Sequence, residues 1–380
     1  MRTLLRASGT RTKKTLIDEH FMRVAIQLAR RGQGSVAPNP SVGCVIVKDD
    51  KILGRGWTQS GGRPHAETEA IRRAEKLSVG ATAYVTLEPC AHQGETRSCA
   101  QALLDAGISR VVMGVRDPDP RVDGRGVKLL SEAGVIVTEG ICSKEAEEVA
   151  AGFFSRIRLG RPLVTVKVAT SLDGKIATAS GQSKWITGSL SRAIGHGLRA
   201  RYDAVLVGGH TAYTDNPSLT CRLPGLEQRS PIRIVMDGQD ELPKTHVLLS
   251  SGREVPTWIM MPRGLRQDRQ KRYREQGAEI IEIDVDPENK INLELALSVL
   301  GRRGITRLMV EGGGKIISRL LQRRLVDRLV WFRSPRIIGA DGVSVPAALG
   351  TRTLDEALNL VKLSDRSAGD DMIETYGLSL

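Results

Sequence analysis

The chain has 380 residues, which predicts two or three domains at the usual size of about 150 residues each. Hydrophobic residues make up 40% and charged residues 26% of it, as in ordinary globular proteins, and no window approaches the roughly 18 uninterrupted apolar residues of a membrane span. The net charge is +13, but the first 14 residues carry five basic residues and no acid, which leaves +8 for the other 366; with 3% aromatic residues, this favours anionic small molecules over nucleic acid as partners.

The basic segment 1–14 is predicted to be a disordered tail. An organelle presequence is the alternative, whereas a signal peptide would need a longer apolar core. The five cysteines are few and odd in number, which argues against a disulfide framework and for a reducing cytoplasm. Cysteine side chains are therefore free to bind a metal.

The first half of the chain alternates strand and helix signals. Apolar residues at helical spacing predict a helix from about Asp18 to Arg31, followed by two strands that a tight turn joins. The further predicted strands and helices alternate, so the pattern is a hairpin followed by βαβαβ, typical of a layered α/β domain. The predicted strands are 43–49, 51–57, 82–87, 110–115 and 135–139, and the predicted helices 66–76, 100–106 and 126–133.

A helix at 143–159 and the break "GRP" at 160–162 separate this half from a second α/β domain. We expect a tail at 1–14, a first domain at 15–145, a linker helix at 146–160 and a second domain at 161–380. The second domain has strand signals at 162–169, 203–209, 232–238, 257–261, 278–283 and 307–310, a helix at 315–325, and late antiparallel strands at 327–332 and 371–380.

Three residues of the first domain have the pattern of a zinc site. His65 stands at the start of a predicted helix, Cys90 follows the strand "TAYVTL" through Glu88 and Pro89, and Cys99 begins the next helix. Zn²⁺ binds His and Cys in tetrahedral geometry, and three protein ligands leave a fourth position for water, which makes such a site catalytic. The metal lowers the pKa of that water. Glu67 can then carry its proton to a leaving amine, as in zinc deaminases with a His-x-Glu and Pro-Cys pattern.

The His-x-Glu pair alone would indicate only a helix cap, and the two cysteines are what favour a metal. Glu69 is expected on a solvated helix face, and Cys44 lies in an apolar strand pattern typical of a core. Cys142 and Cys221 lack metal-ligand spacing and are expected to be inert.

The second domain has no G-x-G-x-x-G after a strand. Instead, a strand runs into Glu311 and three glycines and then directly into a helix. Glycines allow close approach, and a helix N-terminus favours anions, so a phosphate could bind there. A simple tight turn is the alternative.

These motifs occur in an order that resembles the RibD-type bifunctional deaminase/reductase family of riboflavin biosynthesis. Residues 15–145 resemble the deaminase half and 161–380 the reductase half. The matched motifs are "PNPSVGCVIV", "PHAE", "AYVTLEPCAH", "DPDPRVDGRG", "VKVATSLDGKIA", "SKWITG", "DAVLVGGHTAYTDNPSLTCR" and "VEGGG".

The resemblance implies a cytidine-deaminase-like three-layer α/β domain followed by a dihydrofolate-reductase-like domain. It implies zinc-dependent deamination of 2,5-diamino-6-(5-phosphoribosylamino)pyrimidin-4(3H)-one with one Zn²⁺ per chain. NADPH-dependent reduction of the ribosyl to the ribityl side chain would then give 5-amino-6-(5-phosphoribitylamino)uracil. The family's enzymes are often dimers or larger, so a homo-oligomer is expected.

The family's site residues carry over by position. In the first half, Asn39, His92, Asp117 and Asp119 would contact substrate, although Asn39 and the two aspartates between prolines could simply form turns. The second half would contact NADPH through Ala169, Trp185, Thr211, Asp215, Gly238, Gly313 and Gly314. It would contact substrate through Lys167, Ser183, Arg199, Leu219, Arg222 and Glu311, with the arginines as phosphate partners. Core packing is the alternative for Trp185, and a solvated helix face for Arg199.

The chain departs from the family in the zinc loop, where Arg97 and Ser98 replace two prolines, and at Asp119, where asparagine is frequent. Two other functions remain possible at this point. One is a nucleic-acid (tRNA) deaminase with an RNA-binding C-terminal domain, suggested by the positive charge. The other is a zinc-stabilised binding protein without catalysis, against which Glu67 and the open metal position count.

Overall fold

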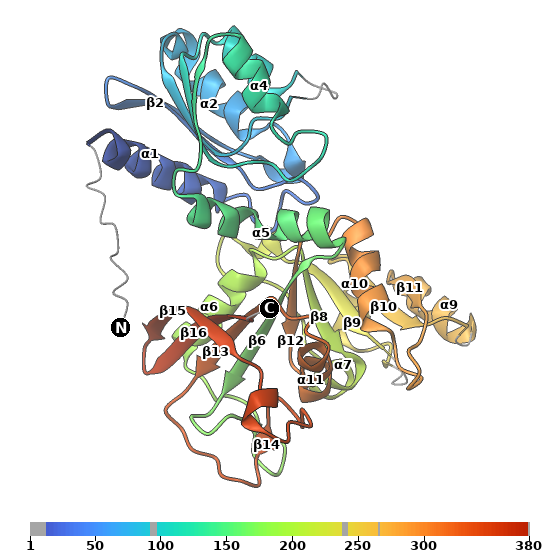
Figure 1. Ribbon diagram of the computed structural model, residues 1–380. Helices are drawn as coiled ribbons and strands as arrows, with labels where there is room; N and C mark the ends of the chain where they lie inside the picture. The colour runs from blue at the N-terminus through green and yellow to red at the C-terminus, as the bar shows by residue number, and fades with distance from the viewer. Residues whose placement is uncertain (1–12, 92–96, 238–241, 265–266, 379–380) are drawn as a thin grey trace. The chain divides into compact units, whose positions relative to one another are not determined.

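The computed structural model describes residues 13–91, 97–237, 242–264 and 267–378. The predicted contacts His92 and Gly238 lie outside these residues. The chain divides into two compact units between Ile157 and Arg158, within the helix that follows the first sheet (Figure 1). Each unit has its own sheet and its own hydrophobic cores.

The first unit contains a five-stranded sheet in the order β2-β1-β3-β4-β5. β1 is antiparallel to both β2 and β3, whereas β3, β4 and β5 are parallel. The predicted hairpin followed by βαβαβ is therefore confirmed. The strands are β1 (Gly43–Lys48), β2 (Lys51–Trp57), β3 (Thr82–Leu87), β4 (Arg110–Val115) and β5 (Ile136–Thr138).

Helices cover both faces of this sheet. Side chains of a strand alternate between the two faces, so a strand covered on both sides contributes to two cores. Cys44 and Ile46 of β1 pack into one core and Val45 and Val47 into the other, so the strand is apolar throughout. The helices are α1 (Lys13–Ala29), α2 (Ala66–Ala74), α3 (Cys99–Asp105), α4 (Arg125–Glu132) and α5 (Ser143–Leu159). Lys13 and Lys14 belong to α1. The end of the predicted tail at residue 14 and the predicted helix start at Asp18 were therefore both placed too late in the chain.

α2 lies directly against β2. A Cβ atom on Gly56 would stand 2.0 Å from the carbonyl oxygen of Ala66, the first residue of α2, so only glycine permits this approach. The same helix start carries His65 and Glu67, and its position is therefore determined by backbone contact with the sheet.

The second unit contains a nine-stranded sheet in the order β11-β10-β9-β8-β12-β6-β13-β16-β15 (Figure 1). It is parallel from β11 to β13 and antiparallel in its last two strands, as predicted for the C-terminal segments. The strands are β6 (Leu163–Thr170), β8 (Ala204–Gly208), β9 (Ile232–Met236), β10 (Thr257–Pro262), β11 (Glu279–Ile283), β12 (Arg307–Glu311), β13 (Arg328–Arg333), β15 (Leu360–Ala368) and β16 (Asp371–Leu378); β7 (Lys175–Ala177) and β14 (Val343–Ser344) pair separately.

The two larger hydrophobic cores of this unit lie on the β-sheet, and a smaller one contains Val330 and Phe332 of β13. One of the larger cores gathers Val164 and Leu308 with the apolar residues of the helices at 293–302 and 314–322, and the other gathers Val205 and Met309 with Tyr273. The helices are α6 (Ser189–Arg199), α7 (Gly209–Asp215), α8 (Val247–Ser250), α9 (Gln267–Glu275), α10 (Leu293–Arg302) and α11 (Gly314–Gln322).

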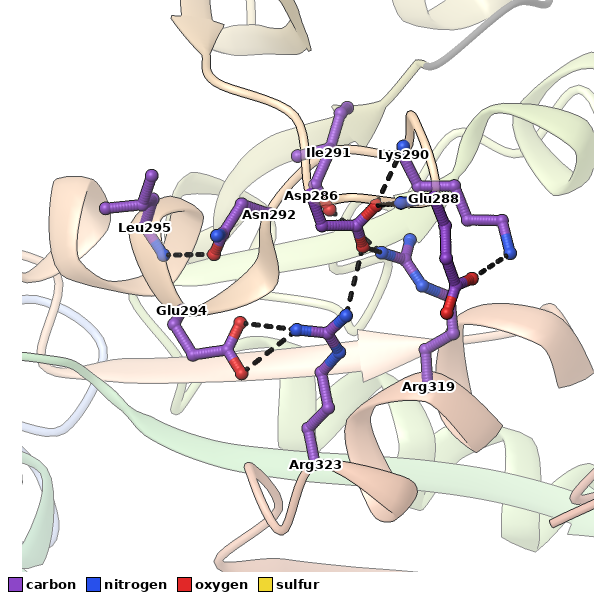
Figure 2. Close-up of polar contacts among 9 residues, drawn as sticks. All are labelled: Asp286, Glu288, Lys290, Ile291, Asn292, Glu294, Leu295, Arg319 and Arg323. Atoms are coloured by element: carbon purple, nitrogen blue, oxygen red, sulfur yellow. Dashed lines mark hydrogen bonds and ion pairs between the residues drawn. The ribbon is translucent and has the colours of Figure 1, made fainter. Parts of the chain in front are cut away.

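A buried carboxylate fixes α11 to the loop after β11 (Figure 2). One oxygen of Asp286 accepts hydrogen bonds from the backbone N–H groups of Glu288 and Lys290, at 3.1 and 3.0 Å. The other oxygen accepts from Arg319 and Arg323, at 2.9 and 3.0 Å. The carboxylate is only 1% exposed, so two cations balance a charge that would otherwise be costly to bury.

Candidate active sites

His65, Cys90 and Cys99 meet at one point of the first unit. His65 precedes α2, Cys90 follows β3, and Cys99 begins α3. His65 Nδ1 lies 3.1 Å from Cys99 Sγ and 3.8 Å from Cys90 Sγ, and the three ligand atoms are all within 4.8 Å of one another. Two sulfurs and one imidazole nitrogen at this spacing fit Zn²⁺, which binds these groups and keeps a further position open.

The electrostatics of the cluster favour a thiolate. The hydrogen bond between the two cysteine side chains lowers the pKa of Cys90 to about 4 and raises the pKa of Cys99. The backbone N–H of Cys99 also donates to Cys90 Sγ, at 3.3 Å. The thiolate is the metal-binding form of cysteine, so the lowered pKa of Cys90 favours metal binding.

Glu67 lies in the first turn of α2 and is 3% exposed. Its side chain lines a cavity of ≈ 40 Å³ together with the three candidate ligands. Burial raises its pKa, because removal from water disfavours the charged carboxylate, while the nearby His65 opposes this shift. A carboxyl group with a raised pKa can both accept and donate a proton near neutral pH.

Asn39 and Asp117 line the same cavity, as the resemblance implies for substrate contacts. Burial raises the pKa of Asp117 to about 7. Asp119 does not line it, because its carboxylate accepts hydrogen bonds from the side chain and backbone N–H of Arg121, at 2.5 to 3.1 Å. These hydrogen bonds fit the turn-forming alternative, and a substrate contact through Asp119 stays a prediction.

Glu69 and Cys44, which the sequence placed on a solvated face and in the core, are both buried. Glu69 is 8% exposed and forms ion pairs with Arg72 and Arg73, so its expected place on a solvated face was wrong. Cys44 is fully buried, as expected. Ser98, which replaces a proline of the family, caps α3 by accepting a hydrogen bond from the backbone N–H of Gln101, at 3.3 Å.

Glu88 lines the same cavity and was not singled out from the sequence. It directly follows β3, is 3% exposed, and accepts hydrogen bonds from four backbone N–H groups of the segment 117–127. The signal available in the sequence was a glutamate between a buried strand and the Pro-Cys pair, where an unpaired charge would be unfavourable.

The second unit contains a larger cavity of ≈ 510 Å³ at the carboxyl ends of β6 and β12. Ligands of parallel α/β sheets bind at this edge, where loops leave the strands. The predicted residues that line the cavity are Lys167, Ala169, Ser183, Trp185, Arg199, Asp215, Leu219, Arg222, Glu311 and Gly313.

Two predicted contacts do not line the cavity but adjoin the glycine turn. Gly312 and Gly313 have φ values of 70° and 76°, and α11 begins at Gly314. A Cβ atom added to Gly313 would stand 2.8 Å from the hydroxyl oxygen of Thr211. Thr211 and Gly314 are thus next to the turn where the sequence predicted a phosphate.

A buried ion pair crosses the second cavity. Arg199 Nε and Nη2 donate to the two carboxylate oxygens of Glu311 at 2.7 and 2.9 Å, and Arg199 Nη1 donates to the carbonyl oxygen of Thr220 at 3.0 Å. Burial acts to raise the pKa of Glu311, but Arg199 outweighs it and lowers the pKa to about 2. Arg199 is therefore buried and paired, and the solvated-face alternative was wrong.

Lys167 is half-buried, whereas Trp185 is exposed. Burial lowers the pKa of Lys167, whose ammonium lies 5.2 Å from the centre of the Phe332 ring. Trp185 is 58% exposed, so the core-packing alternative was wrong. The guanidinium of Arg192, which sequence reasoning missed, lies 4.6 Å from the Trp185 ring centre and also lines the cavity.

Comparison with known proteins assigns each unit to a family. The cytidine and deoxycytidylate deaminase zinc-binding region matches residues 16–115, and the RibD C-terminal domain matches residues 162–373. The riboflavin biosynthesis protein RibD of Aquifex aeolicus is 39% identical over 357 residues, covering 94% of this chain and 97% of the relative. The RibD protein of Escherichia coli is 38% identical over 368 residues, covering 93% and 98%.

Solved structures agree with this assignment. RibD of Acinetobacter baumannii has a TM-score of 0.85 at 36% identity, covering 96% of this chain and 100% of that one. A diaminohydroxyphosphoribosylaminopyrimidine deaminase/5-amino-6-(5-phosphoribosylamino)uracil reductase from Thermotoga maritima has a TM-score of 0.84 at 33% identity, covering 96% and 100%. The two-domain α/β fold class is confirmed, and the chain belongs to the RibD family of riboflavin biosynthesis proteins.

Proposed function

We propose that this chain carries both activities of the bifunctional riboflavin-biosynthesis enzyme. The first unit hydrolytically deaminates 2,5-diamino-6-(5-phosphoribosylamino)pyrimidin-4(3H)-one, and the second reduces the ribosyl side chain with NADPH to give 5-amino-6-(5-phosphoribitylamino)uracil. The observation that carries this proposal is the His65, Cys90 and Cys99 cluster beside the buried Glu67, in a chain that matches both halves of the family.

In the deaminase unit, Zn²⁺ held by the three ligands would supply Lewis-acid activation of the attacking water. Glu67 would take a proton from the attacking water and deliver it to the leaving 2-amino group, so that the C–N bond breaks and ammonia leaves. The water's second proton would end on the adjacent ring nitrogen as the carbonyl forms at C2. Asn39 and Asp117 face the substrate from the cavity wall.

In the reductase unit, NADPH supplies the hydride, and the protein supplies binding and orientation. The glycine turn before α11 offers backbone N–H groups at a helix N-terminus to a cofactor phosphate. Arg222 and Arg192 give the cavity positive charge for the phosphate groups of cofactor and substrate. Glu311 and Lys167 stand opposite each other on the neighbouring strands β12 and β6, and their opposite charges attract. Both face the reacting ribose.

Arg199 has a different role from the one that the resemblance implied. Its two carboxylate-facing nitrogens already bind Glu311, so it orients that carboxylate and is only secondarily a phosphate partner. This pairing keeps Glu311 ionised throughout the physiological pH range.

A homo-oligomer is also part of the proposal. β15 is the last strand of the nine-stranded sheet, and Leu360–Ser367 are all exposed, with the apolar Leu360, Val361 and Leu363 among them. The strand also carries opposite charges at Lys362 and Asp365, which suits antiparallel pairing with a second copy of itself. Sedimentation analysis should give a mass above that of one chain, and Leu363→Glu should shift it to the monomer.

Nucleic acid is not expected as a partner, because the relatives covering 93% or more of this chain are riboflavin biosynthesis proteins and the basic side chains line a small-molecule cavity. Among the described residues, no helix is long and apolar enough to cross a membrane. We propose a cytoplasmic location, in keeping with the small phosphorylated substrates of the proposed reactions.

The proposal is tested with purified protein of known zinc content. Incubation with the diaminopyrimidinone should release ammonia without NADPH and consume NADPH when it is added. Absence of ammonia release would exclude the deaminase, and ammonia release without any NADPH consumption would exclude the reductase.

A further inference from the structure

Glu88 is a buried acid whose carboxylate accepts four hydrogen bonds, each from a backbone N–H group of the segment 117–127. Its Oε2 accepts from the N–H groups of Asp117 and Gly124 at 3.3 and 3.0 Å, and its Oε1 accepts from Gly126 and Val127 at 3.0 and 3.3 Å. Glu88 is 3% exposed. A carboxylate in such surroundings needs a compensating set of donors, and these four amides provide it.

Three of the four donors, Gly124, Gly126 and Val127, form the entry to α4, and the fourth, Asp117, precedes it in the chain. Gly124 caps this helix with a φ of 81°, and Gly126 and Val127 lie in its first turn, where backbone N–H groups have no partner within the helix. The carboxylate satisfies those groups and interacts favourably with the positive end of the helix dipole. Glu88 therefore holds the start of α4 against the end of β3.

The backbone fits closely at this point. A Cβ atom on Gly126 would stand 2.0 Å from the carbonyl oxygen of Pro89, the residue between Glu88 and the candidate ligand Cys90. Gly126 is thus required for α4 to reach the strand end, and Glu88 supplies the acceptors that keep it there.

Asp117 connects this contact to the reaction. It lines the deaminase cavity with Glu88, and its backbone N–H is the first of the four donors. Its carboxylate in turn accepts a hydrogen bond from the N–H of Asp119, at 2.8 Å. A hydrogen bond within the segment 117–127 therefore also helps to fix Asp117.

We propose that Glu88 is a positioning residue for deamination: its carboxylate fixes the segment 117–127 and thereby sets Asp117 against the substrate. The proposal deepens the proposed function and rests on it. The role requires a carboxylate, because glutamine has one acceptor oxygen and an NH₂ group that would face two N–H donors.

The test compares Glu88→Gln with Glu132→Gln. Glu132 also belongs to the α4 region, but its side chain is 67% exposed and lies 3.8 Å from Lys128. In Glu88→Gln we expect a KM for the diaminopyrimidinone about tenfold or more above wild type, a kcat changed much less, stoichiometric zinc and unchanged reduction of the deaminated substrate. Glu132→Gln should match wild type in all four measurements.

A double-mutant cycle with Asp117→Asn tests the route through which Glu88 acts. If Glu88 acts through Asp117, the double variant should have a KM close to that of Asp117→Asn alone. Independent, multiplicative effects on KM would overturn the proposal, and so would a wild-type KM in Glu88→Gln. Zinc loss in proportion to lost activity would overturn it too, because Glu88 would then act on the metal site.

Gly126→Ala provides the second variant if Glu88→Gln does not fold. The added methyl group pushes the segment away from Pro89 without changing any charge, and the same selective rise in KM is expected. An unchanged KM in a folded Gly126→Ala protein would contradict the proposal. Failure of wild-type protein to deaminate would instead reject the proposed function.

Discussion

The two candidate active sites differ in size and in how they are assembled. The deaminase site is a ≈ 40 Å³ cavity whose candidate ligands come from one strand end and two helix starts, all between residues 65 and 99. The reductase cavity of ≈ 510 Å³ is lined by segments from Lys167 to Val345, and one of its side chains, Trp185, is largely exposed. Activity at a compact site depends on each of its few side chains, whereas a large site distributes substrate and cofactor binding over many contacts. Single substitutions should therefore abolish deamination but weaken reduction by degrees.

The largest effect is expected from Cys90→Ser. Loss of this ligand should remove the metal and abolish ammonia release, while reduction of the deaminated substrate continues in the other unit. Metal analysis and the two activity assays measure this, and a chelator should have the same selective effect on wild type. Cys142→Ser, outside the cluster in the same unit, is the control and should keep zinc. Full zinc in Cys90→Ser would remove Cys90 from the ligand set.

Glu67→Gln should lower the kcat of deamination by about 10²–10⁴-fold, the usual contribution of general acid–base catalysis. Zinc content and reduction should stay at wild-type levels, because Glu67 is not among the candidate ligands. Deamination at the wild-type rate would show that another group carries the proton.

Glu311→Gln tests the reductase side through stability. It leaves Arg199 buried without its ionic partner, so we expect the unfolding free energy of this unit to fall by about 3–5 kcal/mol. Because the folded-state pKa of Glu311 is lowered to about 2 from 4.5, the stabilisation is complete above pH 4.5 and disappears as the pH falls towards 2.

Urea unfolding at several pH values measures this difference. The gap between wild type and Glu311→Gln should be constant from pH 8 to pH 5 and narrow below pH 4.5. Glu279→Gln, which removes a half-exposed partner of Arg303, should cost less than about 1 kcal/mol. A gap that widens on acidification would contradict the assigned ion pair.

The smallest effect is expected from Asp286→Asn (Figure 2). The variant keeps an oxygen for the turn amides but presents an NH₂ group to Arg319 and Arg323, so we expect a loss of about 1–3 kcal/mol of unfolding free energy. Glu294→Gln, which changes only a partner of Arg323 that is 48% exposed, is the matched control. Equal stability of the two variants would mean that Asp286 does not hold α11.

The difference between the two sites also explains what the sequence could predict. The zinc cluster was predictable because its ligands stand at element ends that the strand and helix patterns locate. Glu69 was misplaced because neighbouring residues of mixed character give no sign that its side chain is buried. Its partners Arg72 and Arg73 lie three and four residues further along α2. Glu88 was missed because its donors come from 29 to 39 residues further along the chain.

In the second unit, local patterns found most strands but not the cavity. α9 was missed because "QDRQKRYRE" has almost no apolar residues, although Tyr273 within it is fully buried. β15 was missed because its polar and apolar residues do not alternate as in a half-buried strand. Nearly all of its residues are exposed. The cavity residues could be named only by resemblance, since contacts such as Arg199 to Glu311 span 112 residues.

The most direct test of the two-step function uses Glu67→Gln with the diaminopyrimidinone and with its deaminated product, each in the presence of NADPH. Wild type should release one ammonia for each NADPH oxidised with the first substrate. The variant should release almost none and oxidise almost no NADPH with that substrate, yet oxidise NADPH at the wild-type rate with the deaminated one. Rapid NADPH oxidation by the variant with the diaminopyrimidinone, without ammonia release, would contradict the order of deamination before reduction.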